Sequence, residues 1–265
     1  MASTNIKVTH ADTGLVTAEV LRAEQISPHF VRITLGGEDL HRWRSLGFDQ
    51  WFRLALPISA ETRFDRLSDR FDMRGYLRYL ALPKASRPVI RSYTVREYRP
   101  EAGELDVDFV VHGTEGVAGP WAASLPTGAP VALIDQGCGY RPVENANRVL
   151  LAGDESALPA TLGILRDLPD ETTGTAIIEV PHEADQQPVI SPAGINMHWI
   201  VRDTNARPGA EALAALRELP LDGDAPVSAF LAGEQQLATG GRRHLAGERG
   251  IPKTSIDFTG YWRHA

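Results

Sequence analysis

Short apolar runs that alternate with polar positions fill the first half of the chain and predict β-strands. Turn clusters such as Gly36-Gly37 and Pro126-Thr127-Gly128 separate the runs, which are rich in Val, Ile, Thr and aromatic residues. The predicted strands are residues 15–21, 30–35, 51–56, 91–98, 105–112 and 129–134. Six strands at this spacing predict an antiparallel barrel, with one helix from Pro120 or Trp121 to Leu125.

The second half of the chain has a different pattern, in which continuous apolar strands alternate with helical segments. Strands are predicted at residues 148–153, 175–180, 198–201, 227–232 and 255–258, and helices at 157–168, 210–219 and 235–248. Strand alternating with helix predicts crossover units and a doubly wound parallel sheet. We therefore expect two domains, a β-barrel over residues 1–142 and an α/β domain over residues 143–265.

The distribution of charge supports this boundary and excludes one class of function. The chain has a net charge of −7, but residues 1–142 carry 17 Lys+Arg against 17 Asp+Glu, so the whole imbalance lies in the second half. A nucleic-acid-binding protein would show a basic field instead. An anion-binding surface is therefore expected on the N-terminal half.

Composition and missing motifs narrow the chemistry further. With 43% hydrophobic and 23% charged residues, the 265-residue chain is typical of a globular protein. No apolar run reaches the roughly 20 residues of a membrane span, and the N-terminus lacks a signal-peptide pattern. Cys138 is the only cysteine, which favours a reducing cytoplasm. Without CxxC, HExxH, Walker or G-x-S-x-G motifs, zinc, P-loop and serine-hydrolase chemistry are poorly supported, and no resident metal is expected.

An arginine-rich insertion follows the third predicted strand. Its arginines fall at spacings of three or four, which predicts one face of a helix: Arg63, Arg66, Arg70, Arg74 and Arg78. Aspartates lie between them, so the pattern is typical of a solvated, self-neutralised face or a mobile loop. The alternative is an arginine fringe that attracts an anionic substrate to the active site.

The run at residues 91–96, Arg-Ser-Tyr-Thr-Val-Arg, combines cations, an aromatic face and hydroxyls on one predicted strand. Because strand side chains alternate, Arg91, Tyr93 and Val95 share one face, and the residues between them share the other. A flat, redox-active ring with an anionic tail needs an apolar face, edge hydrogen bonds and a positive charge. A half-buried strand with an arginine at each end remains the alternative.

A glycine-rich turn follows the strand that ends near His112-Gly113. Residues 116–122 read Gly-Val-Ala-Gly-Pro-Trp-Ala and lead into the predicted helix. Small residues let backbone N–H groups approach a ligand, and a helix N-terminus favours a diphosphate. The alternative is a plain strand–turn–helix link with Trp121 in the core.

The segment at residues 152–160 lies at the carboxyl end of the first parallel strand, where such sheets bind ligands. Ser156 is a suitable N-cap, and Pro159 fits a first helical turn. Asp154 and Glu155 would repel a phosphate, so this loop is expected to meet a nicotinamide. Glu179 ends the second strand. An acid at this place can accept a hydrogen bond from the ribose 2′-OH of NADH and disfavour the 2′-phosphate of NADPH. A glutamate merely exposed at a strand end is the alternative.

Five motifs together identify a family. The chain resembles the siderophore-interacting proteins, flavin-dependent ferric-siderophore reductases within the ferredoxin-reductase-like superfamily. The motifs lie in the family's order over nearly the whole chain, at residues 91–96, 108–113, 153–160, 232–234 and 260–263. Three positions depart from the family pattern, two of them in one turn. The turn Gly116-Val117-Ala118-Gly119 replaces Gly-Pro-Ala-Ser and loses a hydroxyl that could bind phosphate, and Ser156 replaces threonine.

The resemblance implies a reaction, FAD-dependent reduction of ferric siderophores with electrons from NADH or NADPH. Oxygen donors hold hard ferric iron, and a softer ferrous ion is held less tightly. Flavin accepts a hydride and passes electrons singly, so the cofactor supplies the difficult chemistry. Reduced ferredoxin is an alternative donor. Two alternative functions are a general flavin oxidoreductase serving a protein partner and a non-catalytic siderophore-binding protein. We expect a cytoplasmic monomer.

The resemblance also implies binding residues, and none is expected to be a catalytic acid or base. Tyr93 should pack on the flavin, Thr94 should bond its edge, and Arg91 should pair with a phosphate. The expected FAD contacts are Arg91, Ser92, Tyr93, Thr94, Val95, Asp108, Val110, His112, Gly116, Val117, Ala118 and Trp121. The expected NAD(P)H contacts are Asp154, Glu155, Ser156, Ala157, Glu179 and Glu234. The candidate cations for an anionic siderophore are Arg53, Arg141 and Arg263.

Overall fold

The computed structural model describes residues 4–9, 13–113, 116–221 and 226–264. The chain divides into two compact units. Val8–Cys138 forms one, called here the β unit, and Gly139–Ala265 together with Met1–Lys7 forms the other, called the α/β unit. The chain therefore passes from one unit to the other near residue 8 and again near residue 138, just before the division expected at residue 142.

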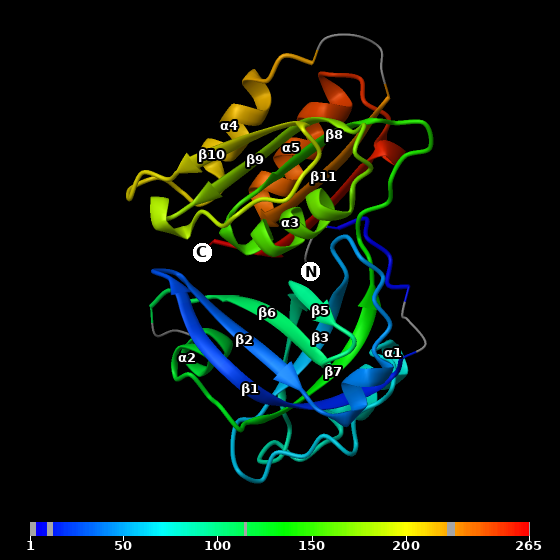
Figure 1. The fold of residues 1–265 in the computed structure, drawn as a ribbon, viewed down its shortest axis with the longest axis vertical. Helices are drawn as coiled ribbons and strands as arrows, with labels where there is room; N and C mark the ends of the chain where they lie inside the picture. The colour runs from blue at the N-terminus through cyan, green and yellow to red at the C-terminus, as the bar shows by residue number, and fades with distance from the viewer. Residues whose placement is uncertain (1–3, 10–12, 114–115, 222–225, 265) are drawn as a thin grey trace. The chain divides into compact units, whose positions relative to one another are not determined.

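The β unit is built on one antiparallel sheet (Figure 1). In the part of the chain that the structure describes, its strands follow the order β4-β3-β7-β1-β2-β6-β5. Their bounds are β1 (Leu15–Ser27), β2 (Phe30–Gly36), β3 (Trp51–Leu56), β4 (Val89–Thr94), β5 (Glu97–Arg99), β6 (Glu104–Val110) and β7 (Pro130–Gly137). The antiparallel fold is confirmed, but it has seven strands and not six.

The additional strand arises because the run expected at residues 91–98 is interrupted. The backbone N–H of Val95 donates to the Gln50 carbonyl at 2.8 Å, and that of Arg96 donates to the Asp106 carbonyl at 2.9 Å. The Val95 N–H thus extends the β3–β4 ladder by one position, because Gln50 directly precedes β3, whereas the Arg96 N–H bonds to β6 instead. β4 ends at Thr94, and β5 begins at Glu97 beside β6.

The core of the β unit follows from alternation along its strands. On β3, Phe52, Leu54 and Leu56 are fully buried in the main cluster, while Arg53 points to the other face. β4 pairs with β3, which aligns Tyr93 with Phe52 and Ser92 with Arg53. Besides the helix of the insertion after β3, the described residues of this unit form two short helices, η1 (Glu38–Arg42) and α2 (Ala118–Ala123). α2 begins two residues before the expected start at Pro120.

The insertion after β3 is only partly helical, so the expectation of one arginine-lined helix over residues 63–78 is wrong. The helix α1 spans Met73–Leu80, and residues 57–72 form turns and bends. Asp72 is the N-cap of α1, because its carboxylate accepts from the Gly75 N–H at 2.8 Å. Arg63 pairs instead with Asp65 at 3.2 Å, at the surface.

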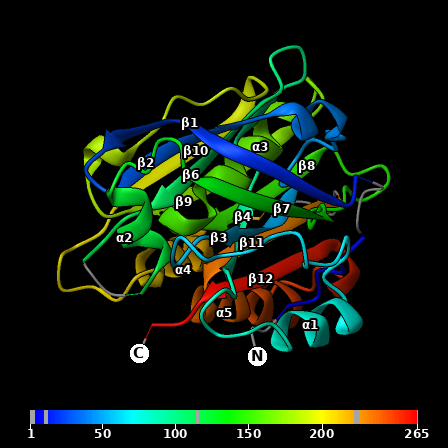
Figure 2. The same cartoon turned by 90° about the horizontal axis from the view of Figure 1, so that it is seen from below.

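The α/β unit confirms the doubly wound parallel sheet, with the order β10-β9-β8-β11-β12 among the described residues. α4 and α5 pack on one face, and α3 lies on the other (Figure 2). The strands are β8 (Arg148–Gly153), β9 (Thr173–Val180), β10 (Gly194–Val201), β11 (Val227–Glu234) and β12 (Ile256–Trp262). The helices are η2 (Glu155–Ala157), α3 (Leu158–Asp167), η3 (Glu183–Asp185), α4 (Ala210–Glu218), α5 (Gln235–Gly247) and η4 (Lys253–Ser255).

The N-terminal segment belongs to the sheet edge of the α/β unit. Thr4 forms an antiparallel bridge with Thr259 of β12. The Asn5 side chain donates to the Ile256 carbonyl at 2.8 Å and accepts from the Phe258 N–H at 2.9 Å. Residues 4 and 5 thus lie along β12, although the β unit lies between them in sequence. Within the described ranges, no helix is long and apolar enough to cross a membrane.

Candidate functional site

β4 presents the cation, ring and hydroxyl of the 91–96 motif in three different environments. Arg91 is exposed, and its Nη1 donates only to the neighbouring Ile90 carbonyl at 2.9 Å. The Ser92 hydroxyl, also exposed, accepts from Arg53 at 2.7 Å. Tyr93 is half-buried, and burial raises the pKa of its phenol, which therefore stays neutral. Among the described residues, no carboxylate forms an ion pair with Arg91.

Three aromatic rings join β4, β6 and α2. The Tyr93 ring lies 4.2 Å from that of Phe109, and the Phe109 ring lies 5.7 Å from that of Trp121, measured between centroids. Phe109 is fully buried, whereas Tyr93 and Trp121 pack against the core from its edge. The expected core role of Trp121 and its proximity to the motif strand are thus compatible. The half-buried Tyr93 ring is one that a flat cofactor can contact.

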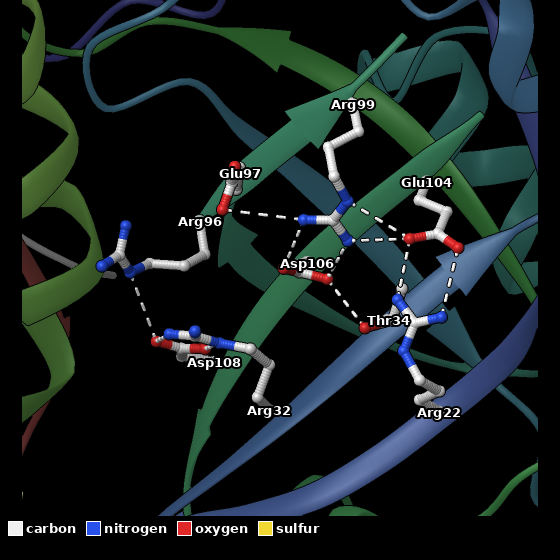
Figure 3. Close-up of polar contacts among 9 residues, drawn as sticks. All are labelled: Arg22, Arg32, Thr34, Arg96, Glu97, Arg99, Glu104, Asp106 and Asp108. Atoms are coloured by element: carbon white, nitrogen blue, oxygen red, sulfur yellow. Dashed lines mark hydrogen bonds and ion pairs between the residues drawn. The ribbon is translucent and has the colours of Figure 1, made fainter. Parts of the chain in front are cut away.

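Asp108 is held by arginines of its own sheet (Figure 3). Its carboxylate is fully buried, accepts from Arg32 at 2.7 and 2.8 Å, and lies 3.5 Å from Arg96. Both oxygens therefore already have cationic partners. Of the neighbouring candidates, Val110 is half-buried at the end of β6 and His112 is exposed. Asp108 acts here as a structural anion that positions Arg96 of the motif.

The same face of the sheet carries a second ion-pair cluster (Figure 3). Arg99 contacts Asp106 at 2.7 Å and Glu104 at 3.1 Å, and Glu104 also pairs with Arg22. Burial opposes ionisation of Asp106, but hydrogen bonds from Arg99 and Thr34 keep its pKa below the usual range. These pairs satisfy one another, so they stabilise the sheet and leave no cation for a ligand.

The glycine-rich turn leaves backbone groups open at the start of α2. Gly116 has a φ of +81°, and a Cβ built there would meet nothing within 4 Å, so conformation and not crowding calls for glycine. Val117 occupies the N-cap position without any side-chain cap. Ala118 is buried as the first helical residue. Residues 114–115 of this turn lie outside the described residues. An uncapped turn of small residues fits a phosphate-bearing cofactor.

The structure therefore fits FAD in the β unit. β4 supplies an unpaired exposed cation, a hydroxyl and a half-buried ring, and the turn before α2 supplies uncapped N–H groups. Thr94 and Val95 are buried behind this surface, where the Val95 N–H bonds Gln50. Thr94 is therefore less accessible to a flavin edge than the motif alone indicated.

Asp154 organises the loop after β8 in the α/β unit. Its carboxylate is fully buried and accepts from Ser156 Oγ at 2.5 Å, the Glu234 N–H at 2.6 Å and Trp262 Nε1 at 3.0 Å. Burial, reinforced by the neighbouring charge of Glu155, raises the pKa of Asp154 to about 7. Asp154, and not Ser156 as expected, is the N-cap residue here. Pro159 lies in the first turn of α3 as predicted.

Glu155 and Glu179 share one cation, Arg202, at the carboxyl ends of β9 and β10. Arg202 contacts Glu155 at 2.8 Å and Glu179 at 2.9 Å. Glu179 is fully buried and also accepts from the N–H groups that begin α4, those of Gly209, Glu211 and Ala212. Its two oxygens leave no exposed acceptor for a ribose hydroxyl. The contact proposed for Glu179 is thus replaced by a structural one.

Glu234, the last residue of β11, is likewise held by hydrogen bonds within the protein. Its carboxylate is buried and accepts from the Gln236 N–H, the His264 N–H and Arg207 at 3.0 Å. Burial opposes ionisation, but these hydrogen bonds keep the pKa of Glu234 below its usual range. Ala157 is also fully buried, so among the six expected nicotinamide contacts only Ser156 is partly exposed. The buried acids Asp154, Glu155, Glu179 and Glu234 therefore mainly stabilise the ends of the strands.

The three arginines expected to bind a substrate differ in whether a carboxylate is paired with them. Arg141 is bound to Asp257 through both its backbone N–H and its guanidinium, so it is committed to an ion pair. Arg263 is exposed at the end of β12, and no ion pair with it is seen among the described residues. Arg53 lies on the outer face of β3 without a carboxylate partner in the described chain.

Sequence reasoning missed Arg202 and Arg207. Both follow β10, and the carboxyl ends of parallel strands meet at one sheet edge. That rule, applied to Glu155 and Glu179 together, could have indicated a shared cation. The aromatic residues of the insertion, Phe71, Tyr76 and Tyr79, were also missed, because the arginine spacing dominated the interpretation of that segment.

An antiparallel domain followed by a doubly wound domain, with these strand-end and turn sites, defines the ferredoxin-reductase-like fold. Residues 19–138 match the siderophore-interacting FAD-binding domain, and residues 146–265 match the siderophore-interacting protein family. The chain belongs to the siderophore-interacting protein family, and its β unit is an FAD-binding domain.

Similar proteins extend over nearly the whole chain. The ferric vibriobactin reductase ViuB of Vibrio cholerae is 32% identical over 92% of this chain and 88% of its own length. The NADPH-dependent ferric-chelate reductase of Escherichia coli is 28% identical over 92% and 91%. The crystal structure of a siderophore utilization protein from T. fusca superposes with a TM-score of 0.79, at 30% identity over 98% and 96%.

Proposed function

We propose that this protein is an FAD-dependent reductase that takes electrons from NAD(P)H and releases iron from ferric siderophores as Fe(II). One observation carries the proposal: β4 of the FAD-binding unit presents Arg91, Ser92 and Tyr93, and no carboxylate of the described residues is paired with the cation. The names of the vibriobactin and ferric-chelate reductases support the reaction class.

Each binding element has a separate task. Tyr93 offers the flavin a neutral ring, and Arg91 offers a phosphate a free guanidinium. The N–H groups at the start of α2, which have no side-chain cap, donate hydrogen bonds to the diphosphate. When bound, FAD supplies the link between a two-electron donor and a one-electron acceptor. The buried Phe109 fixes the Tyr93 ring from behind, so the binding surface exists before the cofactor arrives.

The α/β unit holds the nicotinamide nucleotide at the strand ends around Asp154. The carboxylate bonds Ser156, the Glu234 backbone and Trp262, so it fixes three chain segments in one place. Glu155 is paired with Arg202, which lowers the repulsion of a phosphate expected from sequence. Because Glu179 is buried, it gives no preference for NADH, and we propose that NADPH is also accepted. Reduced ferredoxin is the alternative donor.

Arg53 and Arg263 are the proposed cations for an anionic ferric siderophore, since both lack an acidic partner among the described residues. Arg141 is a structural residue in this proposal, because Asp257 already occupies it. We further propose a cytoplasmic monomer. A chain with one cysteine suits a reducing compartment.

An anaerobic stopped-flow experiment tests the proposal. Protein loaded with FAD is mixed with NADH or NADPH, and the flavin absorbance should bleach. Ferric hydroxamate and catecholate complexes are then added with a ferrous chelator, which should report Fe(II). Tight siderophore binding without Fe(II) would instead indicate a binding protein. Electron transfer to a ferredoxin alone would indicate a general flavin oxidoreductase.

A further inference from the structure

A pocket of about 410 Å³ lies within the β unit, between its β3–β4 edge and the insertion. It is distinct from the surface formed by Arg91 and Tyr93, because it opens on the opposite face of β4. The residues that line it are Arg53, Phe71, Asp72, Met73, Tyr76, Tyr79 and Ile90. One cation, one carboxylate and three aromatic rings therefore surround a space large enough for a small ring.

Arg53 is the cation of this pocket, and the described residues provide no carboxylate that pairs with it. Its guanidinium lies 5.3 Å from the Trp51 ring centre and 5.6 Å from that of Phe71, and it donates to the Ser92 hydroxyl at 2.7 Å. Its Nε is buried without a hydrogen-bond partner in the described structure. Burial lowers the pKa of this guanidinium. A half-buried cation whose Nε lacks a hydrogen-bond partner in the described structure favours an anion from outside the chain.

The carboxylate in the lining does not supply that anion. Asp72 caps α1, with its Oδ1 accepting from the Gly75 N–H at 2.8 Å. No ion pair between Asp72 and Arg53 is found among the described residues. The only acid that lines the pocket thus fixes the start of the helix that carries the aromatic wall.

The aromatic wall consists of Phe71, Tyr76 and Tyr79. Phe71 lies edge-on to both tyrosines, at 6.1 and 5.8 Å between ring centres, and the two tyrosines stack at 6.4 Å. The Tyr79 hydroxyl donates to the Pro88 carbonyl at 3.1 Å, which ties the wall to the strand side. Tyr76 is 44% exposed and so remains open to a ligand. Such rings favour a flat aromatic guest over an aliphatic one of equal charge.

We infer that this pocket binds an anionic aromatic ring, a catecholate or salicylate, as one arm of the ferric siderophore. The ring packs against Phe71, Tyr76 and Tyr79, and its negative oxygens face Arg53. This inference rests on the proposed function and names its substrate class. It also assigns a specificity role to the insertion, whose arginine pattern is typical of a solvated face or a mobile loop, with an arginine fringe as the alternative.

Calorimetric titration of the FAD-loaded protein tests the inference with two acids of equal charge, benzoate and cyclohexanecarboxylate. Benzoate should bind about three- to tenfold more tightly, because only it has an aromatic face. 2,3-Dihydroxybenzoate, free and as its ferric complex, distinguishes an isolated aryl acid from an iron-bound arm. The ferric complex should bind more tightly than the free acid and more tightly than ferric acetohydroxamate.

Two variants assign the effect to the pocket. Phe71→Leu should remove the preference for benzoate and leave cyclohexanecarboxylate affinity nearly unchanged. Arg53→Gln should weaken both acids on the order of tenfold. Leu77→Ala, on the exposed face of α1, and Arg63→Gln, paired at the surface, are the matched controls and should change neither affinity. Thermal melting checks folding, and Tyr76→Leu, at a more exposed ring, replaces Phe71→Leu if that variant does not fold.

Equal affinities for benzoate and cyclohexanecarboxylate in the wild type would overturn the inference, as would an aromatic preference that persists in both ring variants. The proposed function is assessed separately, by flavin bleaching with NAD(P)H and by Fe(II) release from ferric EDTA, which has no aromatic arm. Reduction of ferric EDTA without an aromatic preference would leave the reductase proposal standing and remove the pocket assignment. An aromatic preference without nucleotide-dependent reduction would do the reverse.

Discussion

The charged motif residue of β4 and the acidic motif residues at the strand ends of the α/β unit lie in opposite environments. In the β unit, Arg91 and Ser92 are exposed, and Arg53 has no acid partner in the described chain. In the α/β unit, the carboxylates of Asp154 and Glu179 are fully buried, and backbone N–H groups donate to both. The first set is available to a ligand, whereas the second set holds the protein together.

A sequence motif at a strand end therefore need not contact the ligand that binds near it. Buried carboxylates that accept backbone hydrogen bonds fix the positions of neighbouring loops. The loops then present other atoms to the nucleotide. Substitutions in the α/β motif should therefore lower stability, and substitutions in the β4 motif should lower cofactor affinity.

The largest expected effect is that of Glu179→Ala. The change removes acceptors for three N–H groups at the start of α4 and leaves Arg202 without one of its two carboxylates. The free energy of unfolding should fall by about 3–5 kcal/mol. Urea denaturation followed by circular dichroism measures it, with the exposed Glu183→Ala as control. A small stability loss accompanied by weaker nucleotide binding would return Glu179 to a ligand-binding role.

Asp154→Asn should change how stability depends on pH. Burial raises the pKa of Asp154 to about 7, so the folded state favours the protonated acid. This contribution is complete below the unfolded pKa near 3.8 and is lost as pH rises through the folded value. Between these limits the wild type should lose up to about 1.4 kcal/mol per pH unit relative to the variant. Melting temperatures from pH 4 to 8 test this, with the exposed Asp170→Asn as control. Parallel curves would contradict a buried neutral acid.

The smallest of these effects is that of Arg91→Gln, and it should appear in binding. FAD affinity should fall on the order of tenfold, because one charge-assisted phosphate contact is lost. The cofactor-free protein should keep its unfolding free energy within about 0.5 kcal/mol, since the side chain is exposed and has no acid partner. Flavin fluorescence titration measures the affinity, and Arg22→Gln is the surface control. Unchanged FAD affinity would remove Arg91 from the site.

Much of the fold could be predicted, because alternation and apolar runs mark regular elements well. The strands at residues 51–56 and 148–153 have the bounds expected from sequence. The insertion was predicted wrongly, since arginine spacing reports a helical face but does not show where the helix begins. The helix begins after Asp72, because the Asp72 carboxylate caps the Gly75 N–H. The strand division near Thr94 depends on the Asp106 carbonyl of β6, to which the Arg96 N–H turns, and the sequence does not show this partner.

The candidate site was less predictable than the fold, because sequence shows residue types but not their partners. Glu179 stands at the end of a strand as expected, yet three N–H groups from α4 and Arg202 occupy it. Arg141 was a plausible substrate cation until Asp257 was found beside it. Arg53 was expected for its charge, while its aromatic surroundings depend on a segment some twenty residues away in sequence.

The pairing of Thr4 and Asn5 with β12 has a consequence for handling the protein in parts. β12 is the edge strand of its sheet, and a bare strand edge can recruit other chains. A fragment that starts at residue 139 would expose that edge and should aggregate. Supplying residues 4–7 as a peptide, or fusing them after the C-terminus through a flexible linker, should cover the edge again and prevent the aggregation.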